Sequence, residues 1–105
     1  MHMICYAHNK NHERKVEILK AMAHPVRLAI LEKLRSSDMC ACAIADMFES
    51  DRTTVSKHLA ILKKAGLVED IKEGRNIIYR LKMPCVLDVM PCIEKVIKLE
   101  RERKC

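Results

Sequence analysis

Six of the 105 residues are cysteines, and two of them, Cys40 and Cys42, are separated by a single residue. Two thiolates at this spacing can bind the same soft metal ion. Two sulfurs do not complete a metal site, because arsenite, As(III), takes about three sulfurs, and cadmium, Cd(II), or zinc takes about four ligands. The pair therefore predicts a thiophilic metal site whose remaining ligands come from another part of the chain or from a second copy.

The sequence offers two alternatives for a complete metal site. Cys5, together with His8 and His12, precedes the first predicted helix and could approach the Cys-Ala-Cys pair from an N-terminal arm. Alternatively, Cys85 and Cys92 form a separate site. On a straight helix these two residues share a face but lie about 10 Å apart along the axis, which is too far for one metal ion within a protomer. That second site requires two antiparallel helices from two chains.

The elements that must position these thiols centre on a predicted amphipathic helix between Asp51 and Gly66. Asp51 is a favourable N-cap, and Gly66 can adopt the left-handed conformation that ends a helix. Val55, Leu59 and Leu62 follow the i, i+4, i+7 spacing of a buried stripe. Hydroxyl and basic side chains that can reach base edges and phosphates together are typical of a DNA recognition helix. Those expected to contact DNA are Arg52, Thr53, Thr54, Ser56, Lys57, His58 and Lys63.

An isolated helix with a charged, solvated face would show the same pattern, so its neighbours decide the interpretation. Residues 43–48 form a second apolar helical segment, and only Glu49-Ser50-Asp51 separates it from the first. A short turn between two such helices is typical of a helix-turn-helix.

Two strands are predicted directly after the recognition helix, over residues 67–72 and 76–81. Ile77, Tyr79 and Leu81 alternate and are expected to point inward. The strands meet at Glu73-Gly74-Arg75, where glycine suits a tight hairpin turn. With Lys72, Arg75, Arg80 and Lys82 along it, this hairpin is a wing that can lie on the phosphate backbone or in the minor groove.

Composition and charge agree with a small DNA-binding domain. Half of the residues are hydrophobic, but there is no Trp, one Phe and two Tyr, so the core is expected to be aliphatic. This composition disfavours a single-strand binder that stacks bases on aromatic rings. The formal net charge is +6, and residues 51–82 contain eight Lys or Arg against four acids. The basic excess therefore lies in the part of the chain that would contact DNA.

The remaining elements are three helices and an arm. Residues 1–12 are expected to form a flexible N-terminal arm, and residues 13–103 a DNA-binding and dimerisation domain. A first helix is predicted over residues 13–23, a second from Pro25 to the Ser36-Ser37 pair, with His24 as its cap, and a terminal helix over residues 84–103. The apolar face of the terminal helix is broad for so short a chain. We expect it to pack against a second copy, which would place two recognition helices about 34 Å apart.

Several classes of protein are disfavoured. No segment reaches the roughly 20 apolar residues of a membrane span and no signal peptide is evident, so a cytoplasmic protein is expected. There the cysteines are either buried apolar residues or functional thiolates rather than a disulfide framework. An enzyme is not expected, because there is no glycine-rich phosphate loop and little room for a closed cleft. A metal-storage or redox-relay protein would use the thiols without a DNA-binding segment.

Several runs of residues together resemble the ArsR/SmtB family of winged-helix repressors. The similarity extends over residues 13–103. The resemblance implies a mainly α-helical protein with a small β-hairpin, a winged helix-turn-helix that forms a homodimer through its terminal helices. It also implies a transcriptional repressor that binds double-stranded operator DNA and releases it when a metal, metalloid or oxidant occupies thiol or imidazole sites. The matching runs are residues 19–31, 55–59 and 64–68, followed by Gly74-Arg75 and Tyr79.

The resemblance to the family also indicates which ions to expect as the inducer. The Cys40-Ala41-Cys42 run resembles the core of the family's sensors for arsenite, cadmium and lead, although Ala45 stands where arsenite sensors carry a third thiol. The zinc site that the family has on its terminal helix is not matched, since the corresponding positions are Met83, Cys85, Val96 and Leu99. We therefore expect arsenite or cadmium before zinc, bound by Cys40 and Cys42 or by Cys85 and Cys92. A repressor of the same fold that responds to dithiol oxidation or sulfide is the alternative.

Overall fold

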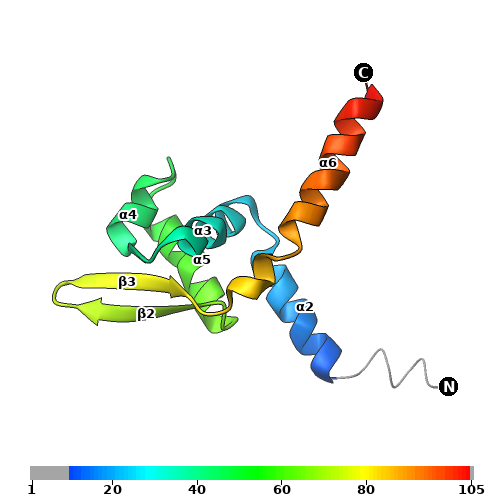
Figure 1. Ribbon diagram of the computed structural model, residues 1–105. Coiled ribbons are helices and arrows are strands. Elements are labelled where there is room, and N and C mark those ends of the chain that lie inside the picture. The colour runs from blue at the N-terminus through cyan, green and yellow to red at the C-terminus, as the bar shows by residue number, and fades with distance from the viewer. Residues whose placement is uncertain (1–9, 105) are drawn as a thin grey trace.

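Two helices, α3 (Pro25–Ser36) and α5 (Arg52–Lys64), cross at the centre of the computed structural model, which describes residues 10–104 (Figure 1). α3 begins as the sequence predicts. Pro25 occupies its first turn, and the His24 side chain caps it, with Nδ1 accepting a hydrogen bond from the Val26 N–H at 3.1 Å. The fully buried side chains of the core are Ile30, Leu31, Ile44, Val55, Leu62, Val68 and Leu87.

The helix-turn-helix consists of α4 (Ala41–Asp46) and α5. α4 begins two residues before the predicted segment and ends two residues earlier, because Cys40 acts as its N-cap. Ile44 is the fully buried residue of α4 and attaches it to the core. Gly66 has a φ of 84°, so α5 ends in the left-handed conformation that the sequence predicts.

The sheet has three antiparallel strands in the order β1-β3-β2. The hairpin of β2 (Val68–Glu73) and β3 (Asn76–Leu81) confirms the predicted wing, and Gly74 takes a φ of 62° at its turn. The additional strand, β1 (Met39–Cys40), was not predicted, since two residues are too few for an alternating pattern. Ile77 is exposed near the wing tip, contrary to the inward orientation expected, because the tip extends beyond the core.

The first helix, α2 (Lys10–Met22), begins three residues earlier than predicted. Its last residues, Ala21 and Met22, are buried against the core. Helix α2 therefore includes part of the segment expected to be a flexible arm. Residues 1–9 of that arm, including Cys5 and His8, lie outside the described residues.

The terminal segment corrects the prediction of one continuous helix over residues 84–103. It consists of a short 3-10 helix, η1 (Pro84–Leu87), and a separate α-helix, α6 (Met90–Lys104). A continuous helix would require the N–H of residue 91 to bond to the carbonyl of Leu87, and Pro91 has no N–H. Leu87 is fully buried, and Asp88 pairs with Arg35 of α3 at 3.2 Å. The start of the segment is therefore attached to the core while α6 leaves it.

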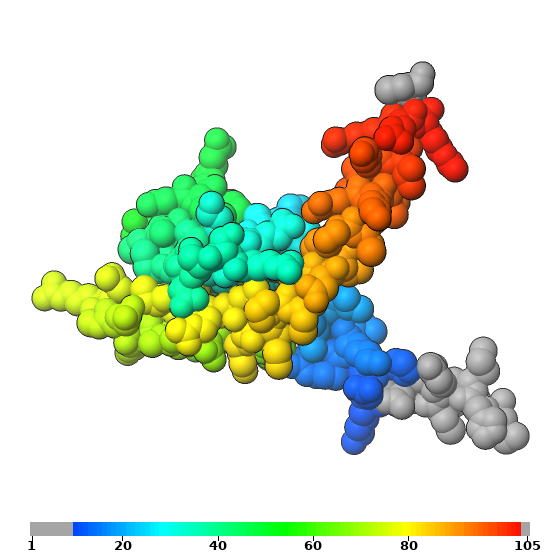
Figure 2. Space-filling view, in the orientation of Figure 1, coloured from blue at the N-terminus to red at the C-terminus, as the bar shows by residue number. Residues whose placement is uncertain are grey.

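Helices α2 and α6 extend away from the body on the side opposite the wing and diverge from each other (Figures 1 and 2). All side chains from Pro91 to Arg103 are exposed. Large apolar side chains lie on both helices, and such exposed apolar surface marks an interaction site. They are Val16 and Leu19 on α2, Ile93, Val96, Ile97 and Leu99 on α6, and Val89 just before it. Within residues 10–104, no helix is both long and apolar enough to cross a lipid bilayer.

Candidate nucleic-acid interface and thiol sites

The first two turns of α5 carry a group of exposed polar side chains. The buried stripe of Val55, Leu59 and Leu62 fixes the rotation of the helix, as the sequence predicts. The Asp51 carboxylate accepts a hydrogen bond from the Thr54 N–H at 2.7 Å, and this bond lowers the pKa of Asp51. We call the exposed group the outer face of α5; it consists of Arg52, Thr53, Thr54, Ser56 and Lys57.

His58 is only partly exposed and is not part of the outer face, so its predicted contact with DNA stays a prediction. Its ring lies 4.3 Å from the ring of His24, centroid to centroid, and its Nδ1 atom is buried with no hydrogen-bond partner. The His58 ring therefore packs against the cap of α3 and is only partly exposed to solvent. Desolvation, followed by the charges of His24 and Arg27, lowers the pKa of His58.

Lys63 is exposed but already paired. Its Nζ atom lies 2.9 Å from Oδ1 of Asp70 on β2. The hydrogen bond between them raises the pKa of Lys63 and lowers the pKa of Asp70. A phosphate contact from Lys63, as predicted from the sequence, would therefore have to compete with Asp70.

The wing retains two free cations. Lys72 and Arg75 are exposed, and neither takes part in an ion pair among the described residues. Arg80, by contrast, pairs with Asp38 at 3.1 Å and with Glu69 at 3.7 Å. The positive charge available near the wing tip therefore belongs to Lys72 and Arg75.

Cys40 and Cys42 have different environments. The Cys40 Sγ atom is half-buried and accepts a hydrogen bond from the Ala43 N–H at 3.4 Å. Cys42 is exposed and lines a hollow of about 90 Å³ between α4 and α5, which also has Arg52 and Ser56 in its wall. The structure therefore places one thiol of the predicted pair directly beside the outer face of α5.

Cys85 and Cys92 are both exposed, but they lie on different elements, η1 and α6. Because the helix is interrupted between them, the prediction that Cys85 and Cys92 share one face of a straight helix is wrong. Within residues 10–104, no group of three or more His, Cys, Asp or Glu side chains is arranged to hold a metal ion. Neither cysteine pair is thus a complete metal site within the described part of one protomer.

Comparison with known proteins identifies the family. A profile of the family described as "Bacterial regulatory protein, arsR family" matches residues 24–70, from the cap of α3 to the start of β2. An uncharacterized HTH-type transcriptional regulator of Methanocaldococcus jannaschii is 36% identical over 88 residues, which are 83% of this chain and 99% of that protein. The chain belongs to the ArsR family of bacterial regulatory proteins.

Two further proteins are similar to this ArsR-family chain, one in sequence and one in structure. The HTH-type transcriptional repressor SmtB of Mycobacterium tuberculosis is 45% identical over 65 residues, 62% of this chain and 48% of SmtB, so the match spans about half of that relative. The homodimeric winged helix-turn-helix DNA-binding domain Mb0332 of Mycobacterium bovis has a TM-score of 0.74 and 30% identity, and the match covers 90% of this chain and 87% of that one. The predicted fold and family are confirmed. The relatives are transcriptional regulators, as expected for a chain that is not an enzyme.

Sequence patterns did not reveal the contact between His24 and His58. These residues are 34 positions apart, and only the crossing of α3 and α5 brings them together. The capping role of Cys40 was also missed, because cysteine is not among the usual N-cap residues. The proline at position 91 was the available signal for the break before α6.

The lowered pKa of His58 predicts that the protein loses stability in mild acid. The folded chain binds a proton at His58 less readily than the unfolded chain, so the stabilisation is present above about pH 6.5 and is lost as the pH falls below it. The free energy of unfolding, measured with urea, should therefore fall less between about pH 7 and pH 5 in His58→Gln than in the wild type.

The carboxylates whose pKa values are lowered, Asp51 and Asp70, titrate below this window, so they do not mask the effect. An equal loss of stability in both proteins would show that His58 is not the responsible group.

Proposed function

We propose that this ArsR-family chain is a homodimeric transcriptional repressor that binds operator DNA and releases it when a thiophilic ion binds cysteine thiolates. The observation that carries the DNA-binding part is the outer face of α5. Its hydroxyl and basic side chains lie at the capped start of a helix whose opposite side is buried. Such a helix can enter the major groove while short polar side chains reach the base edges.

The free cations of the wing support the same proposal. Lys72 and Arg75 would contact phosphates, which supply affinity without sequence preference. Ser56 and Thr53 would contact bases. This division assigns specificity to α5 and salt-dependent affinity to the wing tip.

Dimerisation is supported by the exposed apolar residues of α2 and α6. Val96 is 56% exposed and Leu19 is 61% exposed, and neither has a packing partner within its own protomer that covers it. A small domain gains burial when such faces pack on a second copy. The M. bovis domain to which the chain is similar is homodimeric.

The position of Cys42 suggests how an inducer would act. A ligand shifts a conformational equilibrium only when it binds the two states differently. An ion held by Cys40 and Cys42 would occupy or distort the hollow that Cys42 shares with Arg52 and Ser56. The geometry of the outer face of α5 would then differ between the free and the bound protein. We favour arsenite or cadmium, with the missing ligands supplied by residues outside the described part or by the partner chain.

Dimerisation can be tested on α6. The wild type should sediment at twice the 12.1 kDa mass of the chain. Val96→Glu places a charge within the apolar face and should shift the protein toward monomer and weaken operator binding, because a buried unpaired charge is costly. Lys98→Glu alters an exposed residue away from the Ile93 and Val96 side of α6 and serves as the control. A wild-type monomer at micromolar concentration would contradict the proposal.

Operator binding can be tested by comparing specific with non-specific DNA in mobility-shift titrations. Ser56→Ala should weaken binding to the operator, taken from the gene's own upstream region, by roughly 1–3 kcal/mol and should have little effect on unrelated DNA. Arg75→Ala should weaken binding to both DNAs alike and reduce the salt slope by about one.

Arg101→Ala is the matched control for the loss of a cation, because Arg101 is exposed near the far end of α6. Equal loss of specific and non-specific binding in Ser56→Ala would exclude a base contact from Ser56.

The sensing thiols can be separated with serine variants. The double variant Cys40→Ser, Cys42→Ser should bind the operator normally, because a serine oxygen can still cap α4, but should not be released by arsenite or cadmium. Cys85→Ser, Cys92→Ser is the matched pair, and release should persist in it.

The opposite result would assign sensing to the terminal segment. Release of wild-type protein by a disulfide-forming oxidant, but not by either ion, would favour the dithiol redox alternative. Thiol titration distinguishes the two, since metal binding protects thiols without forming a disulfide.

A further inference from the structure

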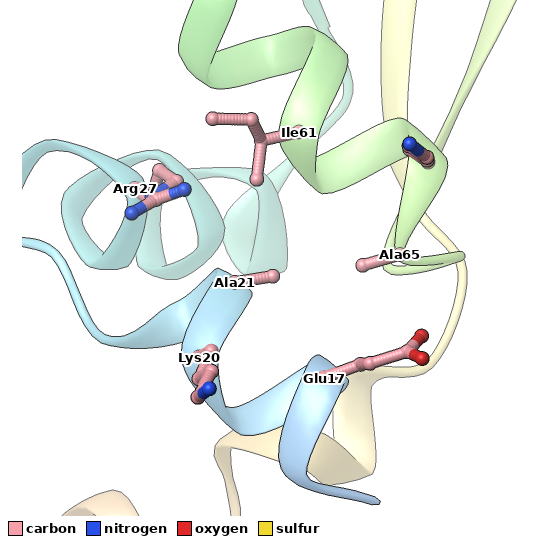
Figure 3. Close-up of a pocket in the computed structure, with 7 residues that line it drawn as sticks. Glu17, Lys20, Ala21, Arg27, Ile61 and Ala65 are labelled. Atoms are coloured by element: carbon pink, nitrogen blue, oxygen red, sulfur yellow. The ribbon is translucent and has the colours of Figure 1, made fainter. Parts of the chain in front are cut away.

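An open surface cavity of about 530 Å³ lies between α2, the start of α3 and the end of α5. This volume is in the range of small-molecule binding sites. None of the described cysteines and no residue of the outer face of α5 contributes to it. Figure 3 shows Lys20, Arg27 and Ile61 on three different helices, with Ala21 between Lys20 and Arg27. The lining residues are Glu17, Lys20, Ala21, Arg27, Ile61, Lys64 and Ala65.

The cavity has an excess of uncompensated positive charge. Its single carboxylate, Glu17, pairs with Nη1 of Arg14 at 3.2 Å. The cationic side chains of Lys20, Arg27 and Lys64 form no hydrogen bond or ion pair among the described residues. An anion in the cavity would therefore meet three free cations and one neutralised acid.

Arg27 supplies a more specific indication. Its Nε atom is buried and has no hydrogen-bond acceptor, and a buried donor without an acceptor is destabilising. The positive charge of Arg27 also contributes to the lowered pKa of His58, whose ring contacts His24. A negatively charged ligand group beside Arg27 would offset this concentration of charge and could accept the unused hydrogen bond.

The remaining wall is apolar. Ala21 is buried, Ile61 is 42% exposed, and Ala65 lies at the end of α5. We propose that the cavity binds a small organic anion, a carboxylate or phosphate ester attached to a compact apolar group. The anionic group lies against Arg27 and the two lysines, and the apolar group contacts Ile61 and the alanines.

DNA is the other source of phosphate in reach of this protein. The cavity is at the C-terminal end of α5, roughly 18 Å along the helix from Arg52, and a concave site with an apolar wall is not filled by the convex backbone of a duplex. The geometry therefore favours a small molecule. Because its walls come from α2 and α5, a bound ligand would fix the first helix relative to the recognition helix. This inference is independent of the proposed thiol site.

Isothermal titration of the full chain with phenyl phosphate tests the inference, with inorganic phosphate and phenol as the matched halves of the probe. Phenyl phosphate should bind saturably at one per chain and more tightly than either half. Binding should weaken at least about tenfold in the double variant Lys20→Met, Lys64→Met, in which both substituted residues are exposed. It should weaken by a similar factor in Arg27→Met. Lys33→Met, an exposed cation of α3 outside the cavity, should bind as the wild type does.

A second readout locates the ligand. Binding beside Arg27 should raise the pKa of His58, followed by NMR, and should raise it less in the double lysine variant. Absence of saturable binding at millimolar phenyl phosphate would overturn the inference, as would equal weakening in Lys33→Met. Loss of operator affinity in the double variant without phenyl phosphate binding to the wild type would instead assign these cations to DNA.

Discussion

The burial of one side of α5 is the constraint on which the rest of the structure depends. Val55, Leu59 and Leu62 are nearly inaccessible to solvent, and they pack among α3, α4 and the sheet. Since a helix has a fixed period, burying this stripe directs Thr53, Ser56 and Lys57 outward. The same rotation turns His58 toward α3. The position of every candidate DNA contact on α5 follows from this packing.

The ion pairs of this protein contribute little to its stability. Their main effect is to determine which basic side chains are already paired and which remain available to other partners. The five pairs formed among the described residues are at least partly exposed, and such pairs contribute little to the free energy of unfolding. They nevertheless engage Lys63 and Arg80, which a count of basic residues would assign to DNA. Within residues 10–104, Lys72 and Arg75 have no ion-pair partner at the wing, and Lys20, Arg27 and Lys64 have none around the cavity. The distribution of unpaired charge therefore separates two surfaces that the net charge of +6 does not distinguish.

The protomer by itself leaves a substantial part of its apolar surface uncovered. Leu87 anchors η1 in the core. From Pro91 to Arg103, however, no side chain of the terminal helix is buried against the described part of its own chain. Helices α2 and α6 diverge from one another and from the body. A second copy that covers them would also fix the distance between two recognition helices. Dimerisation and the orientation of α6 are thereby coupled in the proposed mechanism.

The sequence by itself determined the local structure. Helical periodicity identified α3 and α5, and Asp51, His24 and Gly66 marked helix ends, because capping and left-handed turns depend on residues close in sequence. The motifs also identified the family. Only the tertiary structure decided which distant side chains meet. His24 contacts His58, Lys63 pairs with Asp70, and Cys42 and Ser56 line the same hollow. These contacts depend on how separate elements cross and pack, and neither periodicity nor local spacing specifies that arrangement.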